Sequence, residues 1–168
     1  KAAEWTEDAK TVVWFGGAGR VLAVAGIADR IKETSAQAVA MLHSMNIGVY
    51  MLTGDNEASA GYVARKTGIR HYKAKVMPDD KAAFVRQLQA DGHVVAMAGD
   101  GINDSAALAQ ADLSIAMGKG SDIAMETSMM TILSSDLSKT AEAIRLSQLT
   151  MRTIRQNLFW AFIYNIIA

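Results

Sequence analysis

The chain has 168 residues, of which 17 are basic and 17 acidic, so its formal net charge is zero. This length allows one ordinary domain with a buried core and a small appendage. A balanced charge gives no support for a nucleic-acid surface, which would need a basic excess. The absence of cysteine excludes disulfides and thiolate metal sites within these residues.

The beginning of the chain predicts a hairpin followed by a helix. Runs of β-branched and aromatic residues at 11–15 and 21–25 flank a glycine-rich turn. This pattern is typical of a β-hairpin, because glycine adopts positive φ cheaply. After a connector at 29–34, Ser35 is expected to cap a helix that runs to about Met45.

From residue 47 onward, strand and helix patterns alternate. Strands are predicted at 47–52, 72–76, 93–98, 113–117 and 131–133, and helices at 56–67, 79–90 and 104–109, with a helical turn at 121–126. This order predicts an α/β fold in which a parallel sheet carries helices on both faces. Asp136 is expected to cap a long final helix that continues into an apolar tail.

Two of the predicted strand ends carry residues suited to phosphate and metal binding. TGDN at 53–56 follows one strand, and GDGIND at 99–104 follows another. Ligands of open parallel sheets bind outside the carboxyl ends of the strands, where glycines let backbone N–H groups approach an anion and carboxylates suit Mg²⁺. Either motif alone also fits an ordinary turn, and Lys81 alone fits a solvated lysine. Their combination indicates a phosphoryl site.

Three segments together resemble the phosphorylation domain of P-type ATPases, which belong to the haloacid dehalogenase-like superfamily. They are MLTGDN at 51–56, VMPDDKAAFVRQLQ at 76–89 and GDGINDSAALAQADLSIAMGKGSDIA at 99–124. The resemblance implies a Rossmann-like sheet of the haloacid dehalogenase type. It also implies three parts: 1–27 as the end of a nucleotide-binding domain, 28–135 as a phosphorylation domain lacking its first strand, and 136–168 as a long helix entering a truncated membrane segment.

The same resemblance implies roles for the candidate site residues, with ATP and Mg²⁺ as cofactors. Asp100 would be a Mg²⁺ ligand. Thr53 and Gly54 would hold the transferred phosphoryl group, and Lys81 would neutralise its charge. The rest of the implied catalytic group is Asn103, which would hydrogen-bond the phosphoryl group, Asp104, which would support the cluster, and Asp55. Phosphoryl transfer depends on positioning and charge neutralisation, so these residue types suit it.

One departure from the family pattern limits what the chain can do by itself. The phosphorylated aspartate of the family lies in an Asp-Lys-Thr-Gly-Thr stretch, which is absent from this sequence. Covalent catalysis therefore requires a nucleophile from outside these residues. We expect the missing strand, the rest of the nucleotide domain and further membrane helices to be supplied by the remainder of the same polypeptide, and the isolated chain to be inactive.

The apolar tail points to the transported ion. Residues 154–168 resemble the start of a membrane helix in copper-transporting members of the family, where a Tyr-Asn pair belongs to the Cu⁺ site; Tyr164 and Asn165 match that pair. The implied protein is an ATP-driven Cu⁺ transporter, multi-pass in the membrane, with this domain on the cytoplasmic side. Basic residues before the apolar run agree with that side. Tyrosine is also common at membrane interfaces without binding a metal.

Two other functions fit parts of the sequence. A soluble haloacid dehalogenase-like phosphatase would need its own aspartate nucleophile at a first strand end, followed two residues later by a second aspartate. No strand predicted before residue 51 ends in that way. A catalytically dead binding or regulatory chain would still hold Mg²⁺ and phosphate weakly through Asp100, Lys81 and Thr53.

Overall fold

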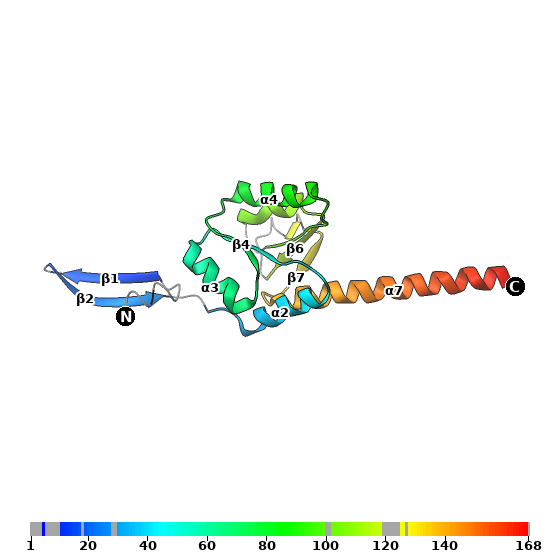
Figure 1. Cartoon of the computed structure of the whole chain (residues 1–168), viewed down its shortest axis with the longest axis horizontal. Coiled ribbons are helices and arrows are strands. Elements are labelled where there is room, and N and C mark those ends of the chain that lie inside the picture. Colours follow the sequence, from blue (N-terminus) through cyan, green and yellow to red (C-terminus); the bar gives the residue numbers. More distant parts are fainter. Residues whose placement is uncertain are drawn as a thin grey trace.

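The computed structural model describes residues 5, 11–17, 19–27, 30–99, 102–118, 125–126 and 128–167 (Figure 1). A two-stranded hairpin comes first, strands and helices then alternate, and a long helix ends the chain. The elements are β1 (Thr11–Gly17), β2 (Arg20–Ile27), α2 (Glu33–Ser44), β3 (Tyr50–Leu52), α3 (Glu57–Thr67), β4 (His71–Lys73), α4 (Pro78–Ala90), β5 (Ala96–Gly99), the 3₁₀ turn η1 (Ile102–Asp104), α5 (Ser105–Gln110), β6 (Leu113–Met117), β7 (Met130–Ile132) and α7 (Leu137–Ile167).

The predicted hairpin is confirmed. β1 pairs antiparallel with β2, with Thr11 opposite Ile27 and Gly17 opposite Arg20. The turn uses Gly19 at φ +74°, a conformation that glycine adopts without strain. Figure 1 shows the hairpin at one end of the molecule, away from the other strands. Trp14 is exposed on it, so the hairpin leaves apolar surface uncovered.

The remaining strands are parallel, as the alternating pattern predicts. β3 pairs with β4, and β6 lies between β5 and β7. Figure 1 shows α4 on one side of these strands and α2 with α7 on the other. The predicted α/β fold with helices on both faces is thus confirmed, although the described strands pair in two parallel groups, β3–β4 and β5–β6–β7.

The core lies where α4 and α5 cover β5 and β6. Val85 of α4 packs with Ala107 of α5, and Leu108 of α5 packs on Ala116 of β6. Half-buried Met97 on β5 contacts both groups. The small side chains of Ala82, Ala107 and Ala111 let α4 and α5 pack closely against each other. The carboxyl end of β5, where GDGIND begins, is therefore held by α5 from one side.

Only the beginning of α7 is packed. Ala141 is fully buried where α7 lies against α2, whose Ala38 is also fully buried. Asp136 caps the helix as predicted, since its carboxylate accepts a hydrogen bond from the Ser138 amide at 2.9 Å. The rest of α7 projects away from the domain (Figure 1). Within the described part of the chain, no helix has an apolar stretch long enough to cross a bilayer.

Several element ends differ from those expected. Ser35 is not the helix cap: α2 begins at Glu33, and the Ser35 amide donates to the Lys32 carbonyl inside the first turn. β4 ends at Lys73 rather than residue 76, and Lys75 has a left-handed φ of +54°, which no strand can continue through. The helical turn expected at 121–126 lies outside the described residues except for 125–126.

Candidate phosphoryl site

The TGDN loop leaves the carboxyl end of β3 and is tied to the segment that follows β4. The Thr53 amide donates to the Lys73 carbonyl at 3.0 Å, and the Val76 amide donates to the Thr53 carbonyl at 2.9 Å. The Thr53 hydroxyl donates to Asp55 Oδ2 at 2.8 Å and accepts from the Asp55 amide at 3.1 Å. Thr53, Gly54 and Asp55 thus form one turn whose backbone is fixed by its neighbours.

The helix that follows this loop begins where the sequence predicts. The Asn56 side chain caps α3 by accepting a hydrogen bond from the Ser59 amide at 3.0 Å, and Gly68 ends the helix at φ +79°. The amino end of α3, with its favourable dipole for anions, therefore lies directly after the TGD turn. Glu57 in the first turn hydrogen-bonds Tyr72 of β4, which raises the pKa of the Tyr72 phenol.

Lys81 forms an ion pair with Asp104. Its ammonium lies 2.8 Å from Asp104 Oδ1, and the two side chains are 14% and 13% exposed. Lys81 belongs to the first turns of α4, which Pro78 begins, and Asp104 ends the η1 turn after β5. A lysine ammonium has three donors, so the pair leaves two of them for an anion. The pair fixes a positive charge close to the GDGIND motif.

Gly99, the last residue of β5, makes this arrangement possible. A Cβ at position 99 would lie 2.6 Å from Asp104 Oδ2 and 2.8 Å from the Asp104 Cβ. The carboxylate of Asp104 thus folds back over the end of β5 into the space that a side chain would fill. Glycine is required at this position for space. A left-handed backbone is not the reason, because the φ of Gly99 is not positive.

Aromatic contacts that the sequence analysis did not single out hold α4 against the β3–β4 pair. The Phe84 ring lies 5.8 Å from the Tyr50 ring of β3, and the Lys73 ammonium of β4 lies 4.1 Å from the Phe84 ring. Phe84 follows Lys81 by three residues on α4, so these contacts also help to orient Lys81. The sequence carried one signal of this contact, because Phe84 follows the candidate Lys81 by three positions and therefore lies next to it on the same helix.

The structure brings some of the predicted site residues together and leaves others apart. Lys81 and Asp104 meet, and Thr53 and Asp55 meet, but no hydrogen bond or ion pair joins the two groups among the described residues. Asn103 is exposed and has no hydrogen-bond partner among the described residues. Asp100 lies outside the described residues. Within the described ranges, no three carboxylate or histidine side chains gather as a metal site would require.

The pair expected to bind the transported ion lies far along α7. Tyr164 is 72% exposed, and the Asn165 amide donates to the Ala161 carbonyl of the preceding turn at 2.8 Å. That bond uses the Asn165 nitrogen and leaves its oxygen available.

Comparison with known proteins places the chain in a family. Residues 1–112 match the model of the haloacid dehalogenase-like hydrolases. A probable copper-transporting ATPase, PacS, from Synechocystis is 52% identical over 99% of this chain. A silver-exporting P-type ATPase from Salmonella typhimurium is 48% identical over 94% of it. The chain covers 22% and 19% of these two proteins.

A solved structure supports the same relationship. The crystal structure of a zinc-transporting PIB-type ATPase in its E2.Pi state matches 93% of this chain with a TM-score of 0.85 and 33% sequence identity, and the chain covers 26% of it. The resemblance found in the sequence is thereby confirmed. The chain belongs to the haloacid dehalogenase-like hydrolase family and is homologous to a segment of the copper-transporting P-type ATPases.

Proposed function

We propose that this chain is part of a P-type ATPase that hydrolyses ATP through an aspartyl-phosphate and couples the reaction to movement of Cu⁺ across a membrane. The observation that carries the proposal is the Lys81–Asp104 pair, held at 2.8 Å beside the end of a parallel strand. Such a positioned charge beside the glycine-rich ends of β3 and β5 suits phosphoryl transfer. The chain spans about a fifth of the relatives it matches, so the whole activity also needs residues outside it.

The division of the strands supports the proposed domain arrangement. β3 and β5 each have an edge that no described strand pairs with, and Ala96 and Ala98 of β5 are exposed. A central parallel strand is normally covered on all sides. We propose that residues 28–135 form a phosphorylation domain whose first strand, from the upstream polypeptide, inserts between β3 and β5. Its carboxyl end would present the nucleophilic aspartate between the two motifs.

We propose the roles that the family resemblance implies, supported by the Thr53–Asp55 and Lys81–Asp104 contacts. Thr53 and Gly54 bind the phosphoryl oxygens, and the Thr53 hydroxyl would turn its hydrogen from Asp55 Oδ2 to a phosphoryl oxygen when the anion binds. Lys81 neutralises the phosphoryl charge, Asp104 keeps the ammonium in place, and Asn103 donates a hydrogen bond. Mg²⁺ prefers oxygen ligands and needs only one or two protein carboxylates beside water and phosphate, and we propose that Asp100 is one of them. When bound with ATP, Mg²⁺ supplies charge neutralisation at the transferred phosphoryl group.

Phosphoenzyme formation in the intact protein tests these roles. Asp100→Asn is expected to abolish Mg²⁺-dependent labelling by γ-labelled ATP, and Lys81→Ala to reduce it by about 10²-fold or more, as loss of a transition-state charge contact does. Asp91→Asn, an exposed residue at the end of α4, is the matched control and should label normally. Undiminished labelling of Asp100→Asn would remove the metal assignment, and the same result for Lys81→Ala would remove the phosphoryl-site assignment.

The proposal of Cu⁺ as the ion rests on the copper-named relatives and on Tyr164 with Asn165. The silver-exporting relative shares 48% sequence identity with the chain, close to the value for the copper-transporting relative, which agrees with a soft monovalent ion. ATP hydrolysis by the intact protein should be stimulated by Cu⁺ and Ag⁺ more than by Zn²⁺. Asn165→Leu should reduce that stimulation, whereas Phe162→Leu on the same helix should not. Equal stimulation by Zn²⁺ would contradict the choice of ion.

We further propose that α7 enters a membrane, with the domain on the cytoplasmic side and the remaining helices supplied by the rest of the polypeptide. Trp160 and Tyr164 are 66% and 72% exposed on a helix that leaves the domain. Aromatic side chains of this kind sit at membrane interfaces. No charged residue follows Arg155 in the sequence.

A further inference from the structure

Two adjoining grooves run along α7 where it leaves the domain. The first, of 450 Å³, lies between the end of α2 and α7 and is lined by Met41, Met45, Arg145 and Arg152 among others. The second, of 660 Å³, continues along α7 and is lined by Arg152, Arg155, Phe159 and Trp160 among others. Gln148 and Arg152 line both, so the grooves form one surface, called here the arginine groove.

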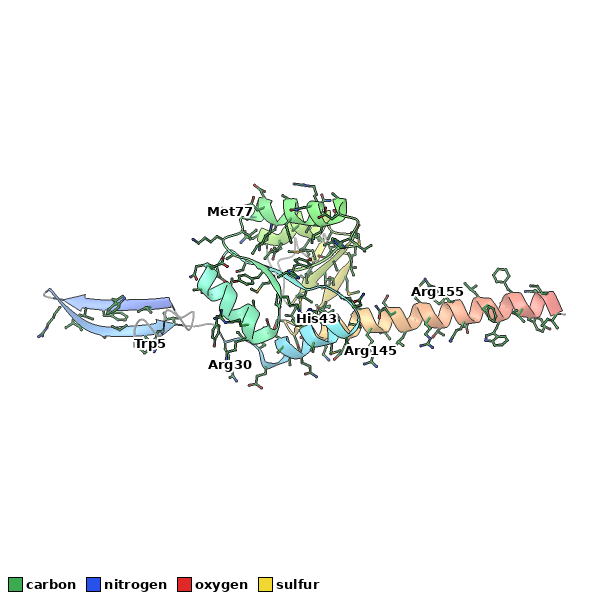
Figure 2. The ribbon with its side chains drawn as sticks, in the orientation of Figure 1. Trp5, Arg30, His43, Met77, Arg145 and Arg155 are labelled. Carbon is green, nitrogen blue, oxygen red and sulfur yellow. The ribbon has the colours of Figure 1, made fainter. Side chains whose placement is uncertain are left out.

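The arginine groove is positively charged without compensation. Its lining contains three arginines and no carboxylate, and the sequence has no acidic residue after Glu142. Glu142 itself is paired with Lys139 at 2.9 Å. Among the described residues, none of the three guanidinium groups has an ion-pair or hydrogen-bond partner. Figure 2 shows Arg145 close to the end of α2 and Arg155 farther out along α7.

The chemistry of the lining changes along the groove in one direction. At the domain end it combines Arg145 and Arg152 with the Gln148 amide, and these donors suit a phosphate group. At the outer end Phe159 and Trp160 lie against each other with ring centroids 5.5 Å apart, and both are more than half exposed. A ligand with an anionic group at one end and an apolar chain at the other would cover both ends of the groove, whereas free phosphate would leave the aromatic end uncovered.

We infer that the arginine groove binds the headgroup of an anionic phospholipid, with the phosphate at Arg145 and Arg152 and an acyl chain along Phe159 and Trp160. The inference rests on the proposal that α7 enters a membrane, and adds a specific lipid contact to it. Because Met41 belongs to α2 and Met45 directly follows it, the bound headgroup would join the phosphorylation domain to the bilayer surface.

Vesicle binding by the whole 168-residue chain tests the inference. Partition is measured by co-flotation into vesicles of phosphatidylcholine and into vesicles with equal parts of phosphatidylcholine and phosphatidylglycerol. Each basic residue near an anionic surface contributes about fivefold to binding. Arg145→Gln with Arg152→Gln should therefore weaken binding to the mixed vesicles by roughly 25-fold and leave binding to phosphatidylcholine unchanged. Arg86→Gln on exposed α4 is the matched charge control and should change neither.

A second variant separates a formed site from diffuse attraction. Arg145→Lys with Arg152→Lys keeps the charge but loses the bidentate geometry that arginine offers to phosphate. The inference predicts weaker binding to the mixed vesicles, while diffuse attraction predicts no change, and no change would overturn the inference. Circular dichroism of each variant should match that of the parent chain. Inorganic phosphate at constant ionic strength should not compete; full competition would make this a free-phosphate site and overturn the lipid assignment.

The outcomes distinguish this inference from the membrane proposal. Binding to neither vesicle type would contradict the membrane proposal. Equal binding to both types would leave the membrane proposal standing and refute the headgroup site.

Discussion

Gly99→Ala provides a direct test of the geometry of the candidate site. The added methyl group would lie 2.6 Å from Asp104 Oδ2, 2.8 Å from its Cβ and 2.9 Å from its Cγ. These contacts are too short to persist, and one of them involves a Cβ that cannot move without the backbone of η1. Asp104 must therefore be displaced, and the 2.8 Å contact with Lys81 is lost.

The size of the effect follows from three contributions. Overpacking costs about 1–3 kcal/mol, and losing a hydrogen bond between charged groups costs about 1.5–3 kcal/mol. Replacing glycine by alanine also lowers the conformational entropy of the unfolded chain, which raises the free energy of unfolding by about 0.4–1 kcal/mol. The free energy of unfolding should therefore fall by roughly 2–5 kcal/mol.

Urea denaturation followed by circular dichroism measures this change, with the shift of the midpoint at constant slope giving the lost stability. Gly48→Ala is the matched control, because its Cβ would meet only the Tyr50 ring edge at an ordinary 3.6 Å. It should change stability by no more than about 1 kcal/mol, and in the stabilising direction.

A double-mutant cycle isolates the contact itself. In an Asp104→Ala background the displaced carboxylate is gone, so adding Gly99→Ala should cost far less than in the parent chain. If Gly99→Ala costs the same in both backgrounds, the close approach of Asp104 to the end of β5 is not the cause, and the reasoning is refuted.

Two further predictions concern the core and the cap of α7. Leu108→Ala, at a position with 0% exposure, should lower the free energy of unfolding by about 2–5 kcal/mol in the same denaturation assay, while Leu146→Ala, at 65% exposure on α7, should change it by no more than about 0.5 kcal/mol. Hydrogen bonds from the Ser138 amide and the Thr34 side chain lower the pKa of Asp136. The stability that this carboxylate contributes is therefore complete above its unfolded pKa of about 3.9 and is lost as pH falls through the lower folded pKa. Asp136→Asn should remove that part of the acid dependence. The measurement is amide hydrogen exchange at the start of α7 as a function of pH, and an unchanged acid profile in the variant would contradict the cap.

Local rules were sufficient for several elements. Asn56 and Gly68 bound α3 because a side-chain cap and a left-handed terminal residue act within a few positions of the chain. The hairpin likewise follows from a glycine-rich turn between two β-forming runs. The motifs also led to the family, since the resemblance of three segments in order was confirmed by the comparisons.

Other boundaries depended on contacts that the local pattern does not contain. Residues 47–49 and 93–95 are apolar enough for strands but lie before the positions where β3 and β5 pair with their neighbours. Ser35 is a good cap residue, yet α2 starts at Glu33 and Lys32 occupies the cap position. Strand and helix ends are set by where a partner begins, which propensity cannot specify.

The sequence by itself determined the α/β class, the hairpin, the ends of α3, the cap of α7 and the family to which the motifs belong, because each of these depends on short stretches of the chain. Only the tertiary structure decided that Gly99 must lack a side chain, that Phe84 holds α4 against β3, and that Arg145 and Arg152 face the end of α2 in one groove. Residues far apart in the chain meet in each of these arrangements, and their distances depend on how the helices pack against the strands.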